Sequence, residues 1–156
     1  MDRLFRQRME YVTSDHFDGC FLCVDAETDD LEANYVLMRD DLCVVVMNRF
    51  PYNSGALLVS PRRHVSALED LTEEERNRVM ALTVKAIEAL KATMSPEGFN
   101  VGANLGAAGG AGVPGHLHMH VIPRWNGDTN FMPVIGETKV LPETLEQSYA
   151  RLKPLF

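Results

Sequence analysis

The most constraining feature of this sequence is a run from His116 to Ile122 in which histidine alternates with an apolar residue. A period of two is that of a β-strand, so the run predicts a strand with its three histidines on one face and Leu117, Met119 and Val121 on the other. Protonation of one imidazole opposes protonation of its neighbours, which keeps at least one of them neutral and nucleophilic near pH 7. A neutral imidazole can attack phosphorus and form a covalent intermediate. The alternatives are an exposed strand that merely carries histidines, and a metal centre that uses two of them.

Five segments combine β-branched and apolar residues between turn signals, and each predicts a strand. One long segment instead places its apolar residues at helical spacing. It begins at Thr72, whose capping-box partner is Glu75, and ends near Met94 or Ser95, just before Pro96. This order of elements predicts an α+β fold with a mostly antiparallel sheet, one long helix and a short C-terminal helix. The predicted strands are residues 35–39, 42–48, 56–60, 99–105 and 116–122, and the C-terminal helix covers residues 142–153.

The composition is that of one globular domain, with 156 residues of which 46% are hydrophobic and 24% charged. We expect a single domain over residues 1–156 with an N-terminal arm over residues 1–15. The formal net charge of −7 opposes general binding to nucleic acid, which needs clustered Lys and Arg, but does not oppose binding of a nucleotide. No apolar run is long enough to cross a bilayer, and the N-terminus lacks the apolar core of a secretory signal. We therefore expect a cytoplasmic protein that binds no membrane.

Cys20 and Cys23 form a Cys-x-x-Cys, the spacing that lets two thiolates bind one metal ion. The chain has three cysteines, an odd number, and structural disulfides are not expected in a reducing compartment. A redox motif, half of a zinc site and a chance spacing all remain open for this pair. Cys43 lies in an apolar strand and is expected in the core.

A glycine-rich segment, residues 102–115, stands directly before the histidines. It has almost no large side chains, so its backbone amides can approach a ligand closely, and phosphate oxygens suit such donors. A flexible connector is the alternative. After the histidines, residues 123–131 include Trp125 and several polar residues. These either contact a base or ribose, or form a capped turn around a buried tryptophan.

The alternating histidine pattern resembles the signature of the histidine-triad (HIT) superfamily of nucleotide hydrolases and transferases, and residues 116–122 match it at every position. The likeness extends to Asn48-Arg49, Ser60–His64, the glycine-rich segment and Pro123–Trp125, and so covers a core of residues 20–131. The run Pro123–Trp125 and the residues after it are most similar to a bacterial branch that includes diadenosine tetraphosphate phosphorylases. The resemblance implies a homodimer with a five-stranded sheet in each subunit and a nucleotide lying over the histidines.

The resemblance also implies a role for each residue of the motif. His118 would be the nucleophile that takes the nucleotidyl group. His120 would contact the α-phosphate and assist proton transfer at the leaving oxygen, and His116 would complete the catalytic set. The glycine-rich segment is one residue longer than in the hydrolase branches and has no Gln, Ser or Thr just before the triad, so backbone amides would replace a side-chain contact. The implied nucleotide-binding residues are Asn48 at the ribose, Asn104, Gly110, Gly112 and His120 at the phosphates, and Trp125.

Zinc-bearing bacterial members of this family, and their galactose-1-phosphate uridylyltransferase relatives, carry a similar set of two cysteines, an upstream histidine and the first histidine of the triad. This resemblance implies a structural Zn²⁺ on Cys20, Cys23, His64 and His116. Such an ion would fasten the N-terminal segment to the histidine strand and keep His116 uncharged. In a metal-free form, His116 would only orient its neighbours.

Together these implications predict an enzyme that cleaves at a nucleoside α-phosphate through a covalent nucleotidyl-histidine, with dinucleoside polyphosphates such as diadenosine tetraphosphate as substrates. Water as the acceptor would make it a hydrolase, and inorganic phosphate would make it a phosphorylase, which the branch likeness favours. The alternatives are a nucleoside phosphoramidate hydrolase and a regulatory module that binds AMP with little turnover. A zinc hydrolase is disfavoured because two cysteines and two histidines would close the coordination shell of the metal.

Overall fold

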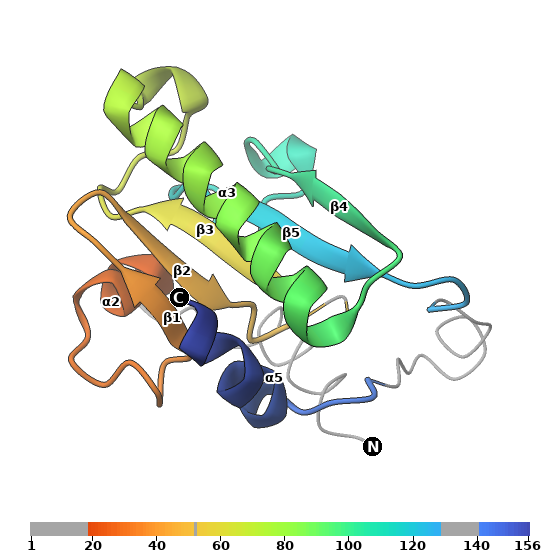
Figure 1. Cartoon of the computed structure of the whole chain (residues 1–156). Helices are drawn as coiled ribbons and strands as arrows, with labels where there is room; N and C mark the ends of the chain where they lie inside the picture. The colour runs from red at the N-terminus through yellow and green to blue at the C-terminus, as the bar shows by residue number, and fades with distance from the viewer. Residues whose placement is uncertain (1–18, 52, 129–140) are drawn as a thin grey trace.

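The computed structural model describes residues 19–51, 53–128 and 141–156, and the predicted N-terminal arm lies outside this part of the chain. Its centre is a five-stranded sheet in the order β1-β2-β3-β5-β4, in which every neighbouring pair is antiparallel (Figure 1). The predicted α+β class with an antiparallel sheet is therefore confirmed. The strands are β1 (Val36–Arg39), β2 (Cys43–Met47), β3 (Leu57–Pro61), β4 (Gly98–Gly102) and β5 (Met119–Arg124).

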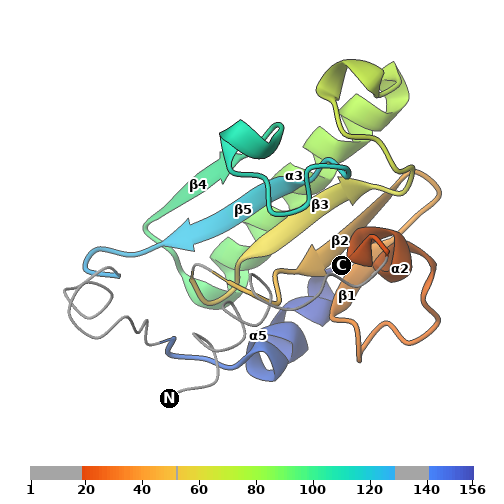
Figure 2. The same ribbon diagram turned by 180° about the vertical axis from the view of Figure 1, so that it is seen from behind.

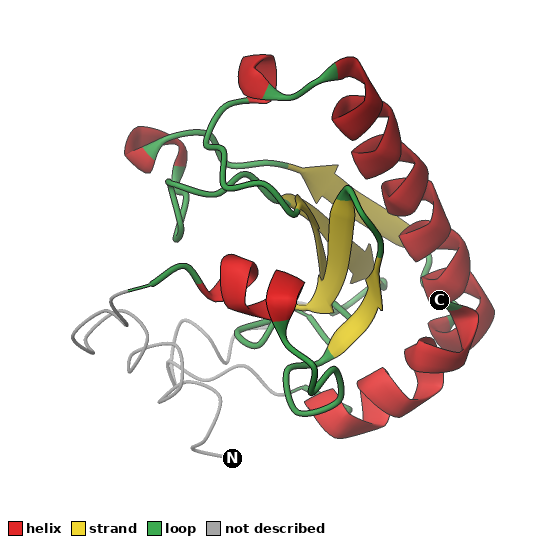
Figure 3. Cartoon of the chain, turned by 90° about the vertical axis from the view of Figure 1, so that its left-hand side faces the viewer, coloured by secondary structure: helices red, strands yellow, loops and turns green. Residues whose placement is uncertain are grey.

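Helix α3 (Glu73–Met94) lies across one face of the sheet, and α5 (Leu145–Leu152) packs on the same side (Figure 3). Helix α2 (Phe21–Glu27) lies on the opposite face. Three short 3₁₀ helices complete the described elements: η1 (Leu68–Asp70), η2 (Ala107–Gly109) and η3 (Lys153–Leu155). No helix in the described ranges is both long and apolar enough to span a membrane.

The long helix has the ends that the sequence predicts. The Thr72 side chain accepts a hydrogen bond from the backbone N–H of Glu75, and the Glu75 carboxylate accepts one from the backbone N–H of Thr72. This reciprocal pair satisfies two of the N–H groups that a helix leaves open at its start. The helix ends where Ser95 adopts a left-handed conformation with φ of 47°, directly before Pro96.

The main core lies between the sheet, α3 and α5, and a smaller core lies between the other face of the sheet and α2. Cys43 is fully buried in the main core, as predicted. Gly55 stands where the loop before β3 meets the end of α3: its φ is +76°, and a Cβ at this position would lie 2.5 Å from the Met94 sulfur. Only glycine satisfies both demands at this point.

The predicted strand over residues 116–122 is wrong at its start, because β5 begins at Met119. The ladder between β3 and β5 pairs Leu57 with Val121 and stops at the pair Val59–Met119. If the register continued, Leu117 would face Pro61, which has no N–H to donate to a ladder. The segment that carries the first two histidines is therefore held by other contacts. The predicted strand over residues 99–105 is also too long, since β4 ends at residue 102.

Candidate active site

Helix α2 and the glycine-rich segment lie on the face of the sheet away from α3 (Figure 2), and the register of β5 places His120 on this face. His120 pairs in register with Leu58, which packs in the core beneath α2. The rings of His118 and His120 are neighbours, with centroids 4.9 Å apart and planes at 66°. His116 instead neighbours His64, at 4.9 Å between ring centroids. The structure thus pairs His118 with His120, and it places His116 beside His64 instead.

The orientation of His118 is set by a backbone carbonyl. Its Nδ1 lies 2.8 Å from the carbonyl oxygen of His116, and His118 is 7% exposed. A carbonyl can only accept a hydrogen bond, so Nδ1 of the neutral ring carries the proton. The lone pair is then on Nε2, the atom that a nucleophilic imidazole must present.

Burial favours the neutral form of both His116 and His120. Burial, with a smaller contribution from the neighbouring His118, lowers the pKa of His120 to about 4. Burial is also the main cause that lowers the pKa of His116. For these two rings, desolvation lowers the pKa more than the mutual repulsion on which the sequence argument relied.

Four residues from distant parts of the sequence form a cluster that could hold a metal ion: Cys20, Cys23, His64 and His116. One ligand atom from each lies within 4.8 Å of all the others. Cys20 Sγ is 3.1 Å and Cys23 Sγ is 3.4 Å from Nδ1 of His116, and Cys23 Sγ is 3.2 Å from Nδ1 of His64. Sulfur and nitrogen ligands of a tetrahedral zinc ion are separated by about 3.5 Å, so this spacing suits such an ion after a small expansion.

The Nε2 atom of His116 makes the hydrogen bond that usually supports a metal-binding histidine. Nε2 lies 2.8 Å from the Pro61 carbonyl oxygen, so it carries the proton and leaves the lone pair of Nδ1 facing the two sulfurs. Burial and the adjacent Cys20 raise the pKa of Cys23 to about 11. A divalent cation would allow both thiols to ionise together. The donor set and its support therefore fit a metal.

The glycine-rich segment begins and ends beside histidines. Gly102 pairs with His120 in the ladder between β4 and β5. At the other end, a Cβ on Gly115 would lie 3.3 Å from Nε2 of His64. Within the segment, the Asn104 side chain donates a hydrogen bond to the Gly110 carbonyl over 3.2 Å. Asn104 therefore closes a small exposed loop over residues 104–110, and Gly112, two residues after it, is also exposed.

Asn48 follows β2 and is nearly buried, at 9% exposed. Its side-chain oxygen accepts a hydrogen bond from the backbone N–H of Phe50 over 2.9 Å, and the backbone N–H of Asn48 donates to the Ala56 carbonyl. These contacts fix the turn between β2 and β3 and do not by themselves indicate a ligand.

The segment after β5 is a capped turn whose centre is Asp128. Its carboxylate accepts two hydrogen bonds from the Arg124 guanidinium, at 2.6 and 2.8 Å, and one from the backbone N–H of Trp125. It also accepts one from the Asn53 side chain over 2.7 Å. Residues 123–128 therefore form a capped turn, but Trp125 is half-buried rather than buried, so part of its surface remains available for a ligand. Residues 129–131 lie outside the part of the chain that the structure describes.

Comparison with known proteins identifies the family of this chain. Residues 31–127 match the family model described as the HIT domain. The chain belongs to the HIT domain family. A Mycobacterium tuberculosis protein named AP-4-A phosphorylase is 49% identical over 117 residues, which are 75% of this chain and 60% of that protein. A Schizosaccharomyces pombe protein named bis(5'-nucleosyl)-tetraphosphatase (asymmetrical) is 30% identical over 121 residues, 78% of this chain and 63% of that protein. The chain thus spans about three fifths of the length of these two relatives.

Among solved structures, a zinc-bound histidine triad family protein from Mycobacterium smegmatis has the same fold, with a TM-score of 0.71 and 23% identity. The match covers 88% of this chain and 92% of that one. It supports the HIT fold itself, with its five-stranded sheet and long helix.

Sequence reasoning missed one buried polar pair in this HIT domain. Asp25 of α2 is 1% exposed, and its Oδ1 lies 2.5 Å from the Arg49 guanidinium. The same guanidinium donates to the Asn34 side chain over 3.1 Å. Burial raises the pKa of Asp25 to about 6, against the opposing effect of Arg49. Because Arg49 directly follows Asn48, this pair ties α2 to the turn after β2. The alternation of polar and apolar residues in α2 carries no signal of such a partner.

Proposed function

We propose that this HIT domain cleaves dinucleoside polyphosphates such as diadenosine tetraphosphate at a nucleoside α-phosphate, with inorganic phosphate as the acceptor. The observation that carries the proposal is the hydrogen bond of 2.8 Å from His118 Nδ1 to the His116 carbonyl, which leaves Nε2 as a nucleophile beside His120. The 49% identity to a protein named AP-4-A phosphorylase supports the substrate class and the acceptor.

In the proposed reaction, the lone pair of His118 Nε2 forms a bond to the α-phosphorus. The bond from that phosphorus to the bridging oxygen breaks, and its electrons leave with ATP. The neutral His120 donates its ring N–H to an oxygen of the reacting phosphate and so stabilises the charge that develops there. Phosphate then attacks the adenylyl-His118, releases ADP and restores the imidazole. The sum is diadenosine tetraphosphate plus phosphate giving ADP plus ATP.

We further propose that the surrounding residues bind the nucleotide as the family resemblance implies. The backbone amide of Gly112 would meet a phosphate oxygen just after the loop that Asn104 closes. The N–H of Gly110 already donates to the Ala107 carbonyl over 3.0 Å, so Gly110 would instead keep the loop open to the phosphates by its lack of a side chain. Asn48 would lie at the ribose, and the available surface of Trp125 would contact the base.

We propose that the metal cluster of Cys20, Cys23, His64 and His116 binds Zn²⁺, because two thiolates and two imidazoles are a typical donor set for a structural zinc ion. When bound, the ion would supply a cross-link between α2 and the histidine segment rather than a reactive ligand. His116 would then present its backbone carbonyl to His118 from a fixed position. Metal content by mass spectrometry, in the wild type and in Cys23→Ser, tests this assignment: about one zinc per chain supports it, and none contradicts it.

The function is tested by following diadenosine tetraphosphate by chromatography, with and without inorganic phosphate, in the wild type and in His118→Ala. Formation of ADP and ATP that requires phosphate and disappears in His118→Ala supports the phosphorylase. Formation of AMP and ATP without phosphate indicates a hydrolase instead, the alternative that the name of the S. pombe relative favours. Turnover of a nucleoside phosphoramidate alone indicates the phosphoramidate hydrolase. Tight AMP binding with no turnover indicates the regulatory module.

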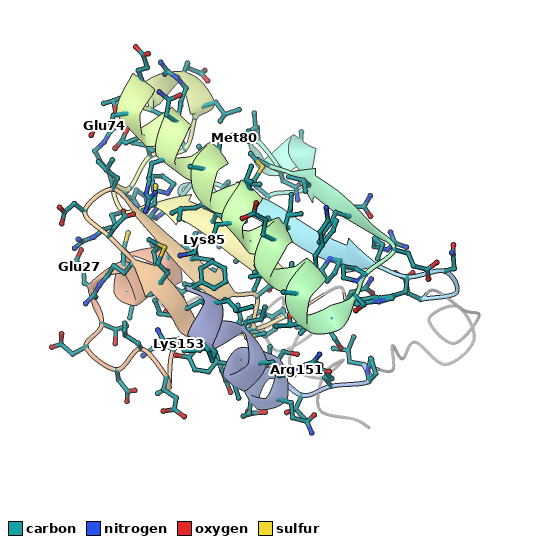
Figure 4. All side chains as sticks on the ribbon, in the orientation of Figure 1. Glu27, Glu74, Met80, Lys85, Arg151 and Lys153 are labelled. Carbon is teal, nitrogen blue, oxygen red and sulfur yellow. The ribbon has the colours of Figure 1, made fainter. Side chains whose placement is uncertain are left out.

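We also propose a homodimer formed along β4, which is an edge of the described sheet. Three apolar side chains near that side of the fold are exposed: Met80 and Val84 on α3, at 55% and 48%, and Val101 on β4, at 45% (Figure 4 labels Met80). A second copy could pair with the free edge of β4 and cover them. Light scattering should give twice the chain mass for the wild type and one chain mass for Val101→Lys. Val24→Lys, on α2, is the matched control and should stay dimeric.

A further inference from the structure

Ser60 is a buried hydroxyl between β3 and the histidine segment. It is 0% exposed, and its Oγ lies 2.8 Å from the carbonyl oxygen of Leu117 and 3.2 Å from that of Pro61. The Pro61 carbonyl already accepts a hydrogen bond from the ring of His116. A hydroxyl has one proton to donate, so Ser60 donates its hydrogen bond to the Leu117 carbonyl, which is the nearer of the two acceptors.

This contact replaces a bond that the sheet cannot make. The register of β3 and β5, continued beyond the pair Val59–Met119, brings Pro61 opposite Leu117. Proline has no N–H, so it cannot donate to the Leu117 carbonyl. A buried carbonyl without a donor is unfavourable, and the Ser60 hydroxyl supplies the missing donor from the neighbouring position on β3.

Leu117 is held on both sides, and this fixes two successive peptide planes. Its N–H donates to the Val65 carbonyl over 2.7 Å, and its carbonyl accepts from Ser60. The first plane contains the His116 carbonyl, which receives Nδ1–H of His118. The second plane joins Leu117 to His118 itself. Because a peptide unit is planar, fixing one of its polar groups fixes the other.

We propose that Ser60 is a positioning residue for His118: by holding the Leu117 carbonyl in place of the N–H that Pro61 lacks, it keeps the His118 ring in the Nδ1–H tautomer and aims Nε2 at the substrate. The consequence for catalysis rests on the proposed function, whereas the consequence for the ring can be measured without any substrate. Ser60 acts through the backbone and does not touch the reacting atoms.

The experiment compares Ser60→Ala with Ser60→Thr, which keeps the hydroxyl, and with Thr83→Val as a matched control. Thr83 is a similarly buried hydroxyl, 2% exposed, that donates to the Val79 carbonyl over 2.8 Å within α3 on the other face of the sheet. Two quantities are measured in each protein: kcat and KM for diadenosine tetraphosphate, and the ¹⁵N signals of the His118 ring at alkaline pH, which report its tautomer.

We expect Ser60→Ala to lower kcat by about 10- to 100-fold with little change in KM, since a small misplacement of a reacting group has effects of this size. Its His118 ring should show both tautomers. Ser60→Thr should recover most of kcat and the single tautomer, and Thr83→Val should lower stability alone. If Ser60→Ala does not fold, Ser60→Cys, which has a similar volume and a weaker donor, serves the same comparison.

Wild-type kcat and an unchanged single tautomer in folded Ser60→Ala would overturn the proposal, as would equal losses of kcat in Ser60→Ala and Thr83→Val. If the wild type turns over no dinucleotide, the proposed function fails, but the tautomer comparison still decides whether Ser60 positions the ring.

Discussion

The replacement of Glu75 by glutamine tests how firmly the start of α3 is joined to the segment that carries His64. The Glu75 carboxylate accepts hydrogen bonds from two nitrogens of Arg63, at 3.0 and 2.8 Å, and from the backbone N–H of Thr72. Arg63 directly precedes His64. Glutamine keeps the bond to Thr72 but loses the charge and the paired contact with Arg63.

The magnitude follows from the carboxyl pKa. The hydrogen bonds from Arg63, together with those from Thr72, lower the pKa of Glu75 from 4.5 to about 2. Such a lowering of the pKa corresponds to about 3.4 kcal/mol. Because the Arg63 side chain is 49% exposed, solvent screening reduces this, and we expect about 1–2 kcal/mol. The pKa is lower in the folded state, so this stability is present above pH 4.5 and is lost as the pH falls towards 2.

Urea unfolding of the wild type and Glu75→Gln at pH 7 and pH 3 measures the effect. The variant should be less stable by about 1–2 kcal/mol at pH 7, and by roughly two fifths of that at pH 3. Glu74→Gln is the control, because Glu74 is an exposed acidic residue in the same first turn (Figure 4) and should lose only about 0.3–0.5 kcal/mol through the helix dipole. An equal loss at both pH values, or an equal loss in Glu74→Gln, would refute the ion-pair explanation.

Three further outcomes follow from the same structure. Gly55→Ala should lower the free energy of unfolding by about 2 kcal/mol in urea titrations, because its φ is +76° and the new Cβ meets the Met94 sulfur; wild-type stability would contradict this. Gly115→Val should weaken zinc binding by about 10- to 100-fold in competition with a chelating dye, since a side chain there displaces His64, whereas Gly98→Val, with nothing within 4 Å, should not. Chelation of the zinc ion that we propose for the metal cluster should lower the midpoint of thermal unfolding by at least about 10 °C, and an unchanged midpoint would argue against a structural ion.

Local signals predicted the fold where the interactions are local. The ends of α3 follow from Thr72, Glu75 and Pro96, all within one turn of the helix end that they determine. Periodicity failed to predict the start of β5, because histidines alternate with apolar residues from His116 onward, whereas strand pairing begins only at Met119. The reason lies at Pro61, more than fifty residues earlier, and no pattern within the run itself can show it.

The residue types of the candidate site could be predicted from the sequence, but the hydrogen bonds that hold them in place could not. The histidine alternation and the Cys-x-x-Cys identify residue types and spacings, and the family resemblance joined Cys20 and Cys23 to His64 and His116. The polar contacts that hold the site link residues far apart in sequence, such as Asn53 with Asp128 across 75 positions. Such partners are determined by tertiary packing, which a single sequence does not display.

The two ends of the glycine-rich segment lie beside histidines that belong to different groups, Gly102 beside His120 and Gly115 against His64. The segment is therefore a bridge anchored at both ends on rigid parts of the fold. Insertions or deletions between the anchors would reshape what surrounds the histidines, while β5 holds His120 and the contacts of the preceding segment hold His116 and His118. Relatives could in this way diverge in the substrates they accept through loop length alone, with His118 and the backbone that supports it inherited unchanged.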